Sequence, residues 1–132
     1  MANPNIPQLD TRSLKAEEAD ASPACVITFN ANDPSGAGGL TADITAITSA
    51  GAHPLAIVTG AYIRDTAEIL DHFSFEEEAV TDQARAALED MPIAAIKVGF
   101  VGSPENISAI AEIASLRRNS ADRLHAQPVV VG

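Results

Sequence analysis

Four apolar runs that lack regular alternation with polar residues constrain the fold of this chain more than any other feature of its sequence. They cover residues 24–31, 54–63, 93–100 and 127–131. Segments with helical periodicity separate them, near residues 40–50, 76–90 and 103–116. Because strands buried on both faces read as continuous apolar runs, this order predicts an α/β fold, a mostly parallel sheet with flanking helices. A weaker, alternating run at 68–74 predicts a short edge strand.

Residues 1–23 differ from the rest of the chain in composition. They are polar, contain several prolines and show no sustained apolar periodicity, which predicts a mobile leader. A short helix over 13–21 is the alternative, since Leu-Lys-Ala-Glu-Glu-Ala favours helix locally. Residues 24–132 are then one domain. A buried parallel strand is normally followed by a covering helix, and the run 127–131 stands at the end of the sequence. We therefore expect the front part of a longer α/β domain.

The charge and the cysteine content argue against several classes of protein. The 132 residues carry 18 acids and 8 bases, a net charge of −10, which disfavours binding to nucleic acid or to an anionic membrane. No apolar run is long enough to span a bilayer. Cys25 is the single cysteine, so no intrachain disulfide is expected, and a reducing, cytoplasmic location is the default. The three histidines lack ligand spacing, so no metal site is predicted.

A glycine-rich loop lies between the first predicted strand and the first predicted helix. Open α/β sheets bind ligands at the carboxyl ends of their strands. The backbone N–H groups of Gly36, Gly38 and Gly39 are therefore candidates to hold an anion or to let a ligand approach closely. The alternative is a tight turn without a ligand. The loop lacks the Gly-Lys-Ser/Thr ending of a P-loop, and Thr41 stands where a dinucleotide fingerprint needs its third glycine.

Asp43 is an acid on the apolar stripe that Leu40, Ile44 and Ile47 form on the first predicted helix. A carboxylate in that position is expected to be partly buried. It then needs a partner, because burial of an unpaired charge costs several kcal/mol. Two interpretations follow: Asp43 satisfies backbone groups of the glycine loop, or it is a polar anchor for a ligand.

Two cations are predicted at the same edge of the sheet. Arg64 ends the second apolar run and is the first basic residue after Lys15. It is a candidate to bind an anion, to pair with Asp65 or Asp43, or to form a surface ion pair of little energetic value. Lys97 stands late in the third apolar run, where its stem can pack while its ammonium reaches the ligand edge. The alternative for Lys97 is a solvated strand end.

The motif Asn-Asp-Pro-Ser-Gly-Ala-Gly-Gly-Leu-Thr-Ala-Asp at 32–43 and Ile-Lys-Val-Gly at 96–99 carry a family resemblance. The chain resembles the hydroxymethylpyrimidine/phosphomethylpyrimidine kinases of thiamine biosynthesis, which are ribokinase-like. The resemblance implies ATP- and Mg-dependent phosphorylation of hydroxymethylpyrimidine or of its monophosphate. It also implies that Asp43 hydrogen-bonds the pyrimidine and that the Gly36–Gly39 loop closes beside it. Because the family commonly dimerises, a homodimer is a possible assembly.

Three residues depart from the pattern of that family. Ala31 stands where a glycine usually touches the substrate, Arg64 where a Glu or Gln reads the pyrimidine, and Phe100 where a Met lines the same pocket. An arginine cannot accept the hydrogen bonds that a glutamate accepts, so the preferred ligand is expected to be more anionic. Substrate contacts are therefore assigned to Asp43, the three loop glycines, Arg64, Lys97 and Phe100.

The resemblance covers the substrate side of such a kinase. The ATP site, the anion hole and the residue that activates the nucleophile belong to the C-terminal half of the family, so no catalytic residue is assigned here, and the chain alone is expected to be inactive. A non-catalytic module that binds a small anion or heterocycle is the alternative function. A third is a dinucleotide-binding fold in which Arg64 receives a 2′-phosphate.

Overall fold

The computed structural model describes residues 22–121 and 129–131. Its elements follow the order β-α-β-β-α-β-α-β, which confirms the predicted alternation. They are β1 (Cys25–Asn32), α2 (Gly39–Ser49), β2 (His53–Arg64), β3 (Ile69–Ser74), α3 (Glu77–Asp90), β4 (Ile93–Val98), α4 (Pro104–Ala121) and β5 (Val129–Val131). Nearly all of the predicted leader, with its alternative helix, lies in residues 1–21, outside the described residues.

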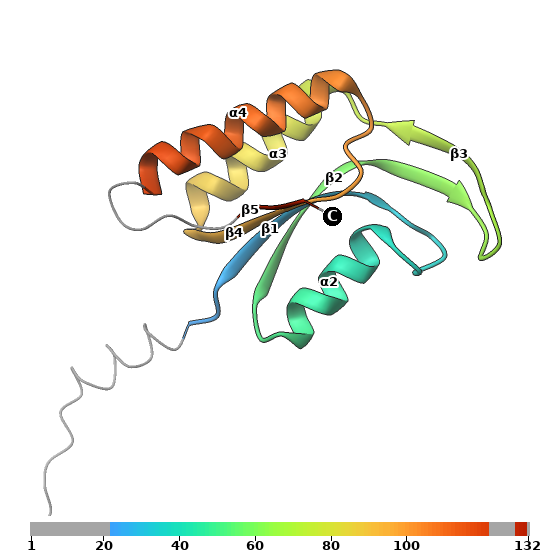
Figure 1. Ribbon diagram of the computed structural model, residues 1–132, viewed down its shortest axis with the longest axis horizontal. Coiled ribbons are helices and arrows are strands. Elements are labelled where there is room, and N and C mark those ends of the chain that lie inside the picture. The colour runs from blue at the N-terminus through green and yellow to red at the C-terminus, as the bar shows by residue number, and fades with distance from the viewer. Residues whose placement is uncertain (1–21, 122–128, 132) are drawn as a thin grey trace, which may run out of the picture.

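The described strands form one five-stranded sheet in the order β3-β2-β1-β4-β5. β1 pairs in parallel with β2 and β4, and β4 pairs in parallel with β5. β3 pairs with β2 in the antiparallel sense and forms the predicted edge strand. Figure 1 shows α3 and α4 on one face of this sheet and α2 on the other. The prediction of a mostly parallel sheet with helices on both faces is therefore confirmed.

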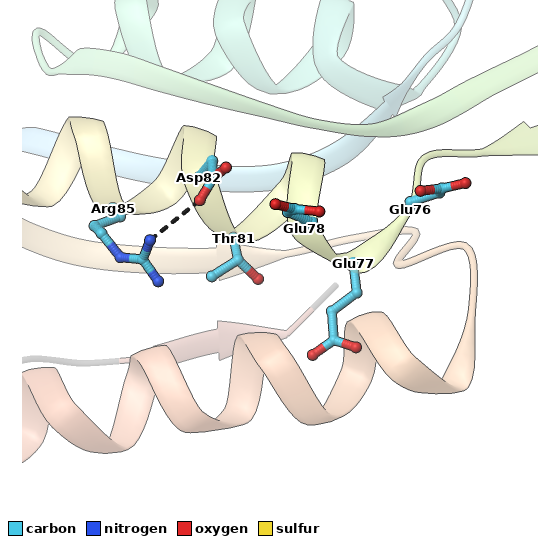
Figure 2. A pocket seen from close by; sticks show the side chains of 6 residues that line it. All are labelled: Glu76, Glu77, Glu78, Thr81, Asp82 and Arg85. Carbon is cyan, nitrogen blue, oxygen red and sulfur yellow. Dashed lines mark hydrogen bonds and ion pairs between the residues drawn. The ribbon is translucent and has the colours of Figure 1, made fainter.

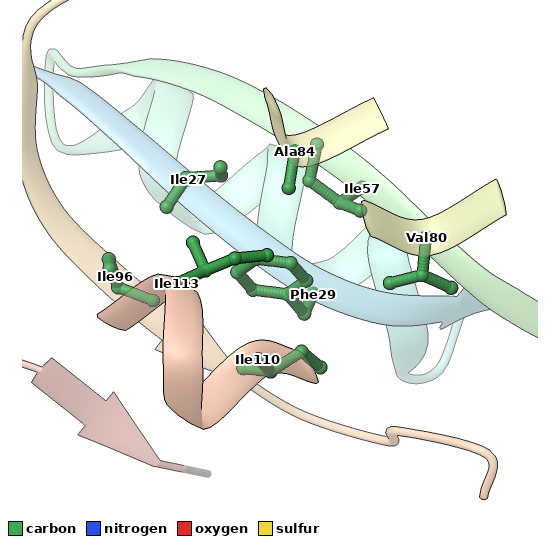
Figure 3. Packing of buried hydrophobic residues seen from close by; sticks show 8 residues of the cluster. All are labelled: Ile27, Phe29, Ile57, Val80, Ala84, Ile96, Ile110 and Ile113. Carbon is green, nitrogen blue, oxygen red and sulfur yellow. The ribbon is translucent and has the colours of Figure 1, made fainter. Parts of the chain in front are cut away.

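The apolar core lies between the sheet and the helix pair α3–α4 (Figure 3). Its buried side chains are Ile27, Phe29, Ile57, Val80, Ala84, Ile96, Ile110 and Ile113. Full burial of a valine, isoleucine or phenylalanine side chain contributes about 1.5–3 kcal/mol. Along β1, Ile27 and Phe29 alternate with Thr28 and Asn30, because successive side chains of a strand point to opposite faces. A run that reads as almost wholly apolar therefore has one apolar face and one polar face.

α2 packs less deeply than its sequence pattern predicts. Leu40 is buried, but Ile44 is 38% exposed, so the expected stripe of Leu40, Ile44 and Ile47 is not a continuous buried contact. The reason is that α2 lies over the polar face of β1, where Asp43 finds hydrogen-bond donors. The helix is held there in part by a polar side chain.

Two elements end two or more residues away from where the sequence predicts. The strand expected over 93–100 ends at Val98, and the helix expected to end near residue 116 continues to Ala121. Ser103 caps the N-terminus of α4, because its Oγ accepts the N–H of Asn106 at 3.2 Å. Within the described part of the chain, no helix combines the length and the apolar character that crossing a membrane requires.

Candidate functional site

Four polar side chains meet between α2 and the centre of the sheet, and we call them the carboxylate cluster: Asp43, Thr28, Asn30 and Lys97. Asp43 comes from α2, Thr28 and Asn30 from β1, and Lys97 from β4. Thr28 and Lys97 are register partners in adjacent parallel strands, which puts both side chains on the α2 face. Asp43 Oδ2 accepts hydrogen bonds from Thr28 Oγ1 at 2.7 Å, Asn30 Nδ2 at 2.9 Å and Lys97 Nζ at 3.1 Å.

The carboxylate cluster stabilises the ionised form of Asp43. The side chain of Asp43 is 13% exposed and that of Lys97 is 25% exposed, and Lys97 Nζ lies 2.9 Å from Asp43 Oδ1. Burial alone raises the pKa of Asp43, but the hydrogen bonds from Asn30, Lys97 and Thr28 and the charge of Lys97 outweigh it. The pKa of Asp43 is therefore lowered. The site therefore holds a charged acceptor between α2 and the sheet.

These contacts bear on the interpretations of Asp43 and Lys97. The prediction that Asp43 is partly buried and paired is confirmed. The interpretation in which it satisfies backbone groups of the glycine loop is wrong, because its described hydrogen bonds come from three side chains. Lys97 does not end in solvent, since its ammonium reaches Asp43.

The glycine loop is held from within by Asp33, which is 2% exposed. Asp33 Oδ1 accepts from the Ser35 amide at 2.9 Å and from the Ser35 hydroxyl at 2.7 Å, and Oδ2 accepts from the Gly38 amide at 2.9 Å. The Gly36 amide donates to the Asp33 carbonyl at 3.1 Å. The Ser35 hydroxyl most strongly lowers the pKa of Asp33, against an opposing effect of burial and with help from the two amides and Arg64. The amides of Gly36 and Gly38 are thus already used, contrary to the expectation that they hold an external anion.

Gly39 begins α2 under tight steric constraint. Its φ is +60°, and a Cβ at this position would lie 2.5 Å from the Ala31 carbonyl oxygen and 2.8 Å from Asp33 Cβ. Only glycine fits this close approach without a shift of the backbone. The role of Gly39 in the structure is to let α2 start directly against the end of β1.

Arg64 forms its ion pair with Asp33 and not with Asp43, and its hydrogen bond to Asp65 is to the backbone carbonyl. Arg64 Nη1 lies 3.5 Å from Asp33 Oδ2, and Nε donates to the Asp65 carbonyl oxygen at 2.9 Å. The arginine side chain is 17% exposed. This is not the solvated surface pair of the alternative interpretation, because the Asp33 partner is buried. Arg64 thus brings a cation from β2 to the glycine loop.

Phe100 is held at this edge by its backbone and by its ring. Its amide donates to Asn30 Oδ1 at 3.0 Å, and its carbonyl oxygen accepts from Thr59 Oγ1 at 2.6 Å. The β1–β2 register shifts between Asn30 and Ala31, so Thr59 lies in an irregularity of β2. The Phe100 ring centroid lies 5.0 Å from that of Tyr62 and 5.3 Å from that of His72. Aromatic side chains therefore connect the segment after β4 with the β2–β3 hairpin.

The predicted site residues fall into two linked groups. Asp43 and Lys97 are in direct contact, and Asn30 joins Asp43 to Phe100. Arg64 belongs with Asp33 and the loop glycines, and within the described part of the chain it forms no ion pair with Asp43. Sequence reasoning omitted Thr28 and did not assign Asn30 or Asp33 to the site. The signal for the first two was a pair of polar residues two positions apart within an apolar run.

A separate hollow lies on the first turns of α3 (Figure 2). It is lined by Glu76, Glu77, Glu78, Thr81, Asp82 and Arg85. Arg85 and Asp82 form an ion pair at 3.1 Å, and their side chains are 62% and 60% exposed, so the pair contributes little. The excess of carboxylates disfavours an anionic ligand, and this surface is not included in the candidate site.

Comparison with known proteins identifies what the chain resembles. A family model described as phosphomethylpyrimidine kinase matches residues 33–132. A hydroxymethylpyrimidine/phosphomethylpyrimidine kinase of Streptomyces coelicolor is 25% identical over 100 residues, which are 76% of this chain and 37% of that protein. The corresponding kinase of Mycobacterium leprae is 29% identical over 99 residues, 75% of this chain and 36% of that protein. The chain thus spans little more than a third of the length of these relatives.

Solved structures of similar proteins share this architecture. A phosphomethylpyrimidine kinase from Clostridium difficile superposes with a TM-score of 0.68 at 25% identity, over 82% of this chain and 44% of that structure. A pyridoxal kinase from Staphylococcus aureus superposes with a TM-score of 0.62 at 22% identity, over 83% of this chain and 38% of that structure, which supports the fold alone.

Proposed function

Because this chain belongs to the phosphomethylpyrimidine kinase family, we propose that its described residues supply the substrate side of a phosphotransferase. The substrate is hydroxymethylpyrimidine or its monophosphate. Transfer of phosphate from ATP then depends on residues beyond those described. Such transfer is mostly a matter of positioning and charge stabilisation. The part proposed for this chain is to bind the pyrimidine and to orient it.

The observation that carries the proposal is the arrangement of the two Asp43 oxygens. Oδ2 accepts three hydrogen bonds, whereas Oδ1 contacts only Lys97 Nζ among the described residues. A carboxylate oxygen can accept more than one hydrogen bond. Asp43 Oδ1 therefore retains capacity for an N–H or O–H group of a heterocycle. Such a charge-assisted hydrogen bond is about twice as strong as a neutral one.

The loop amides of Gly36 and Gly38 and the two site carboxylates have partners within the chain, which argues against a magnesium–triphosphate group here. The amides of Gly36 and Gly38 donate within the loop, and the carboxylates of Asp33 and Asp43 are each paired with a cation of the chain. No group of three or more possible metal-ligating side chains occurs in the described ranges. ATP with magnesium supplies the phosphoryl group in such kinases, and we assign no residue of this chain to it.

Arg64 is proposed to shift the preference of the site toward the monophosphate. Two of its nitrogen atoms are used, by Asp33 and by the Asp65 carbonyl, but no described residue accepts from Nη2. A guanidinium edge of this kind suits a phosphate oxygen. Arg64→Gln is expected to weaken binding of hydroxymethylpyrimidine monophosphate about tenfold and to leave the unphosphorylated form nearly unchanged. Calorimetric titration with both ligands measures this, and equal losses for the two would contradict it.

The decisive experiment titrates the 132-residue chain with hydroxymethylpyrimidine, beside Asp43→Asn and the control Asp82→Asn. Asp82 is an exposed acid in a surface pair, so its substitution should leave the dissociation constant unchanged. Asp43→Asn should weaken binding at least about tenfold, because a hydrogen bond to a charged group contributes about 1.5–3 kcal/mol.

The same titrations separate the candidate functions. No phosphorylation is expected when ATP and magnesium are added to the chain alone. Turnover above background would contradict the assignment of a substrate side only. If wild-type chain binds neither pyrimidine, the proposal fails. If it binds other small anions or heterocycles equally well, the non-catalytic binding module is the better description.

A further inference from the structure

Both polar atoms of the Asn30 side chain form hydrogen bonds inside the site. It is 6% exposed. Its Nδ2 donates to Asp43 Oδ2 at 2.9 Å, and its Oδ1 accepts from the Ala31 amide at 2.9 Å and from the Phe100 amide at 3.0 Å. A flipped amide would point its NH2 group at two backbone donors and its oxygen at a carboxylate. The partners therefore permit one orientation.

The neighbouring backbone is shaped around this side chain. A Cβ on Gly99 would collide with the side-chain amide of Asn30, so the residue after β4 can approach only as glycine. Both backbone polar groups of Phe100 are held, the amide by Asn30 and the carbonyl oxygen by Thr59. A movement of Asn30 would therefore be transmitted to the segment that carries the Phe100 ring.

Asn30 also determines how Asp43 presents its free acceptor. Together with Thr28 it fixes Oδ2 against β1, and this leaves Oδ1 as the oxygen with open capacity. Lys97 bridges both oxygens and cannot by itself select one of them. The neutral donors Thr28 and Asn30 thus set the rotation of the Asp43 carboxylate.

We propose that Asn30 is a positioning residue: it orients Asp43 so that Oδ1 faces the ligand, and it fixes the Phe100 segment relative to that oxygen. This inference rests on the proposed function, in which Asp43 binds the pyrimidine. One side chain then couples two ligand-side groups that come from α2 and from the segment after β4.

Two substitutions separate the donor and acceptor halves of Asn30. Asn30→Asp has nearly the same shape and keeps an oxygen for the Ala31 and Phe100 amides, but it replaces the donor to Asp43 by a second carboxylate. Asn30→Ala removes both halves. Asn106→Ala is the matched control, because Asn106 is also a fully buried asparagine, whose Nδ2 donates to the Phe75 and Val101 carbonyls, away from Asp43.

The readouts are the carboxyl titration of Asp43, followed by nuclear magnetic resonance, and the dissociation constant for hydroxymethylpyrimidine. The charged side chain that contacts Asp43 is Lys97, and it is present in all of these variants. Both Asn30 variants should raise the pKa of Asp43 and weaken binding about tenfold or more. The Phe100 amide resonance should move more in Asn30→Ala than in Asn30→Asp. Asn106→Ala should lower the melting temperature and leave the Asp43 titration and the dissociation constant unchanged.

Two different results would overturn two different statements. If both Asn30 variants lower the melting temperature as Asn106→Ala does, with an unmoved Asp43 titration, Asn30 is only structural and the inference is refuted. If the wild-type chain does not bind the pyrimidine, the proposed function fails, and the titration still tests whether Asn30 controls the Asp43 carboxylate.

Discussion

Replacement of Lys97 by methionine tests whether the carboxylate cluster contributes to stability as its geometry indicates. Methionine keeps an unbranched apolar stem and removes the ammonium that lies 2.9 Å from Asp43 Oδ1. Asp43 then keeps the hydrogen bonds from Thr28 and Asn30 but loses its countercharge. Lys97→Met should therefore destabilise the fold through the lost charge and not through a cavity.

The size of the effect follows from distance and exposure. At 2.9 Å two unit charges attract by about 1.4 kcal/mol in a water-like dielectric and by about 6 kcal/mol at an effective dielectric of about 20. Desolvation and side-chain ordering offset most of this attraction. Exposed pairs are worth about 0–1 kcal/mol, and the loss of one partner from a fully buried pair costs about 3–5 kcal/mol. With side chains 25% and 13% exposed, we expect Lys97→Met to cost about 1–2 kcal/mol.

Urea denaturation as a function of pH measures this cost and its origin. The pKa of Asp43 in the fold is below its ordinary value of 3.8. The stabilisation from its ionised form is thus fully present above 3.8 and is lost as pH falls through the folded-state pKa. The difference in the free energy of unfolding between wild type and Lys97→Met should have its full size near neutral pH and should become smaller below pH 3.8.

Arg85→Met provides the matched control, since it removes the cation of a pair at 3.1 Å whose side chains are 62% and 60% exposed. Its cost should stay below about 0.5 kcal/mol. The reasoning is refuted if Lys97→Met costs no more than Arg85→Met, or if its cost is the same in acid as at neutral pH.

Two further predictions concern the glycine loop and the aromatic contacts. Gly39→Ala should cost more than about 3 kcal/mol and Gly51→Ala only about 1–2 kcal/mol, because both have positive φ but only Gly39 has backbone atoms in the space of a Cβ. Thermal denaturation compares them, and equal losses would refute the steric argument. Burial, with the charge of Asp33, raises the pKa of Tyr62 against the opposing charge of Arg64. Since Tyr62 is the single tyrosine, ultraviolet titration should show a midpoint above 10.0, and a midpoint at or below that value would contradict the burial.

The parallel sheet could be predicted because its strands read as nearly continuous apolar runs with few polar residues. Because the run reads as apolar throughout, the polar face of β1 could not be predicted from it. The exposure of Ile44 on α2, which packs over that face and leaves Ile44 38% exposed, could therefore not be predicted either. The strand end at Val98 could not be predicted from the apolar run 93–100. It depends on Gly99, whose amide donates to the Phe29 carbonyl oxygen, and on Asn30. Both contacts are remote in sequence.

The members of the site were easier to predict than their partners. Asp43 and Lys97 stood out singly, but their contact depends on strand order and on the register that aligns Thr28 with Lys97. Local periodicity contains no information on either. The position of Arg64 at a strand end is confirmed, but local sequence does not identify Asp33 as its partner. A turn-forming aspartate and a buried counter-ion have the same local sequence signature.

The alternation along β1 has a consequence for how substitutions act on this protein. Substitutions of Ile27 or Phe29 alter the packing of the apolar core. Substitutions of Thr28 or Asn30 alter the hydrogen bonds to Asp43. A saturation scan of residues 27–30 should therefore give two interleaved profiles: Ile27 and Phe29 should tolerate other apolar residues, whereas Thr28 and Asn30 should tolerate only side chains that keep their hydrogen bonds. Tolerance to mutation would then change with every step along the chain, although all four residues belong to one strand.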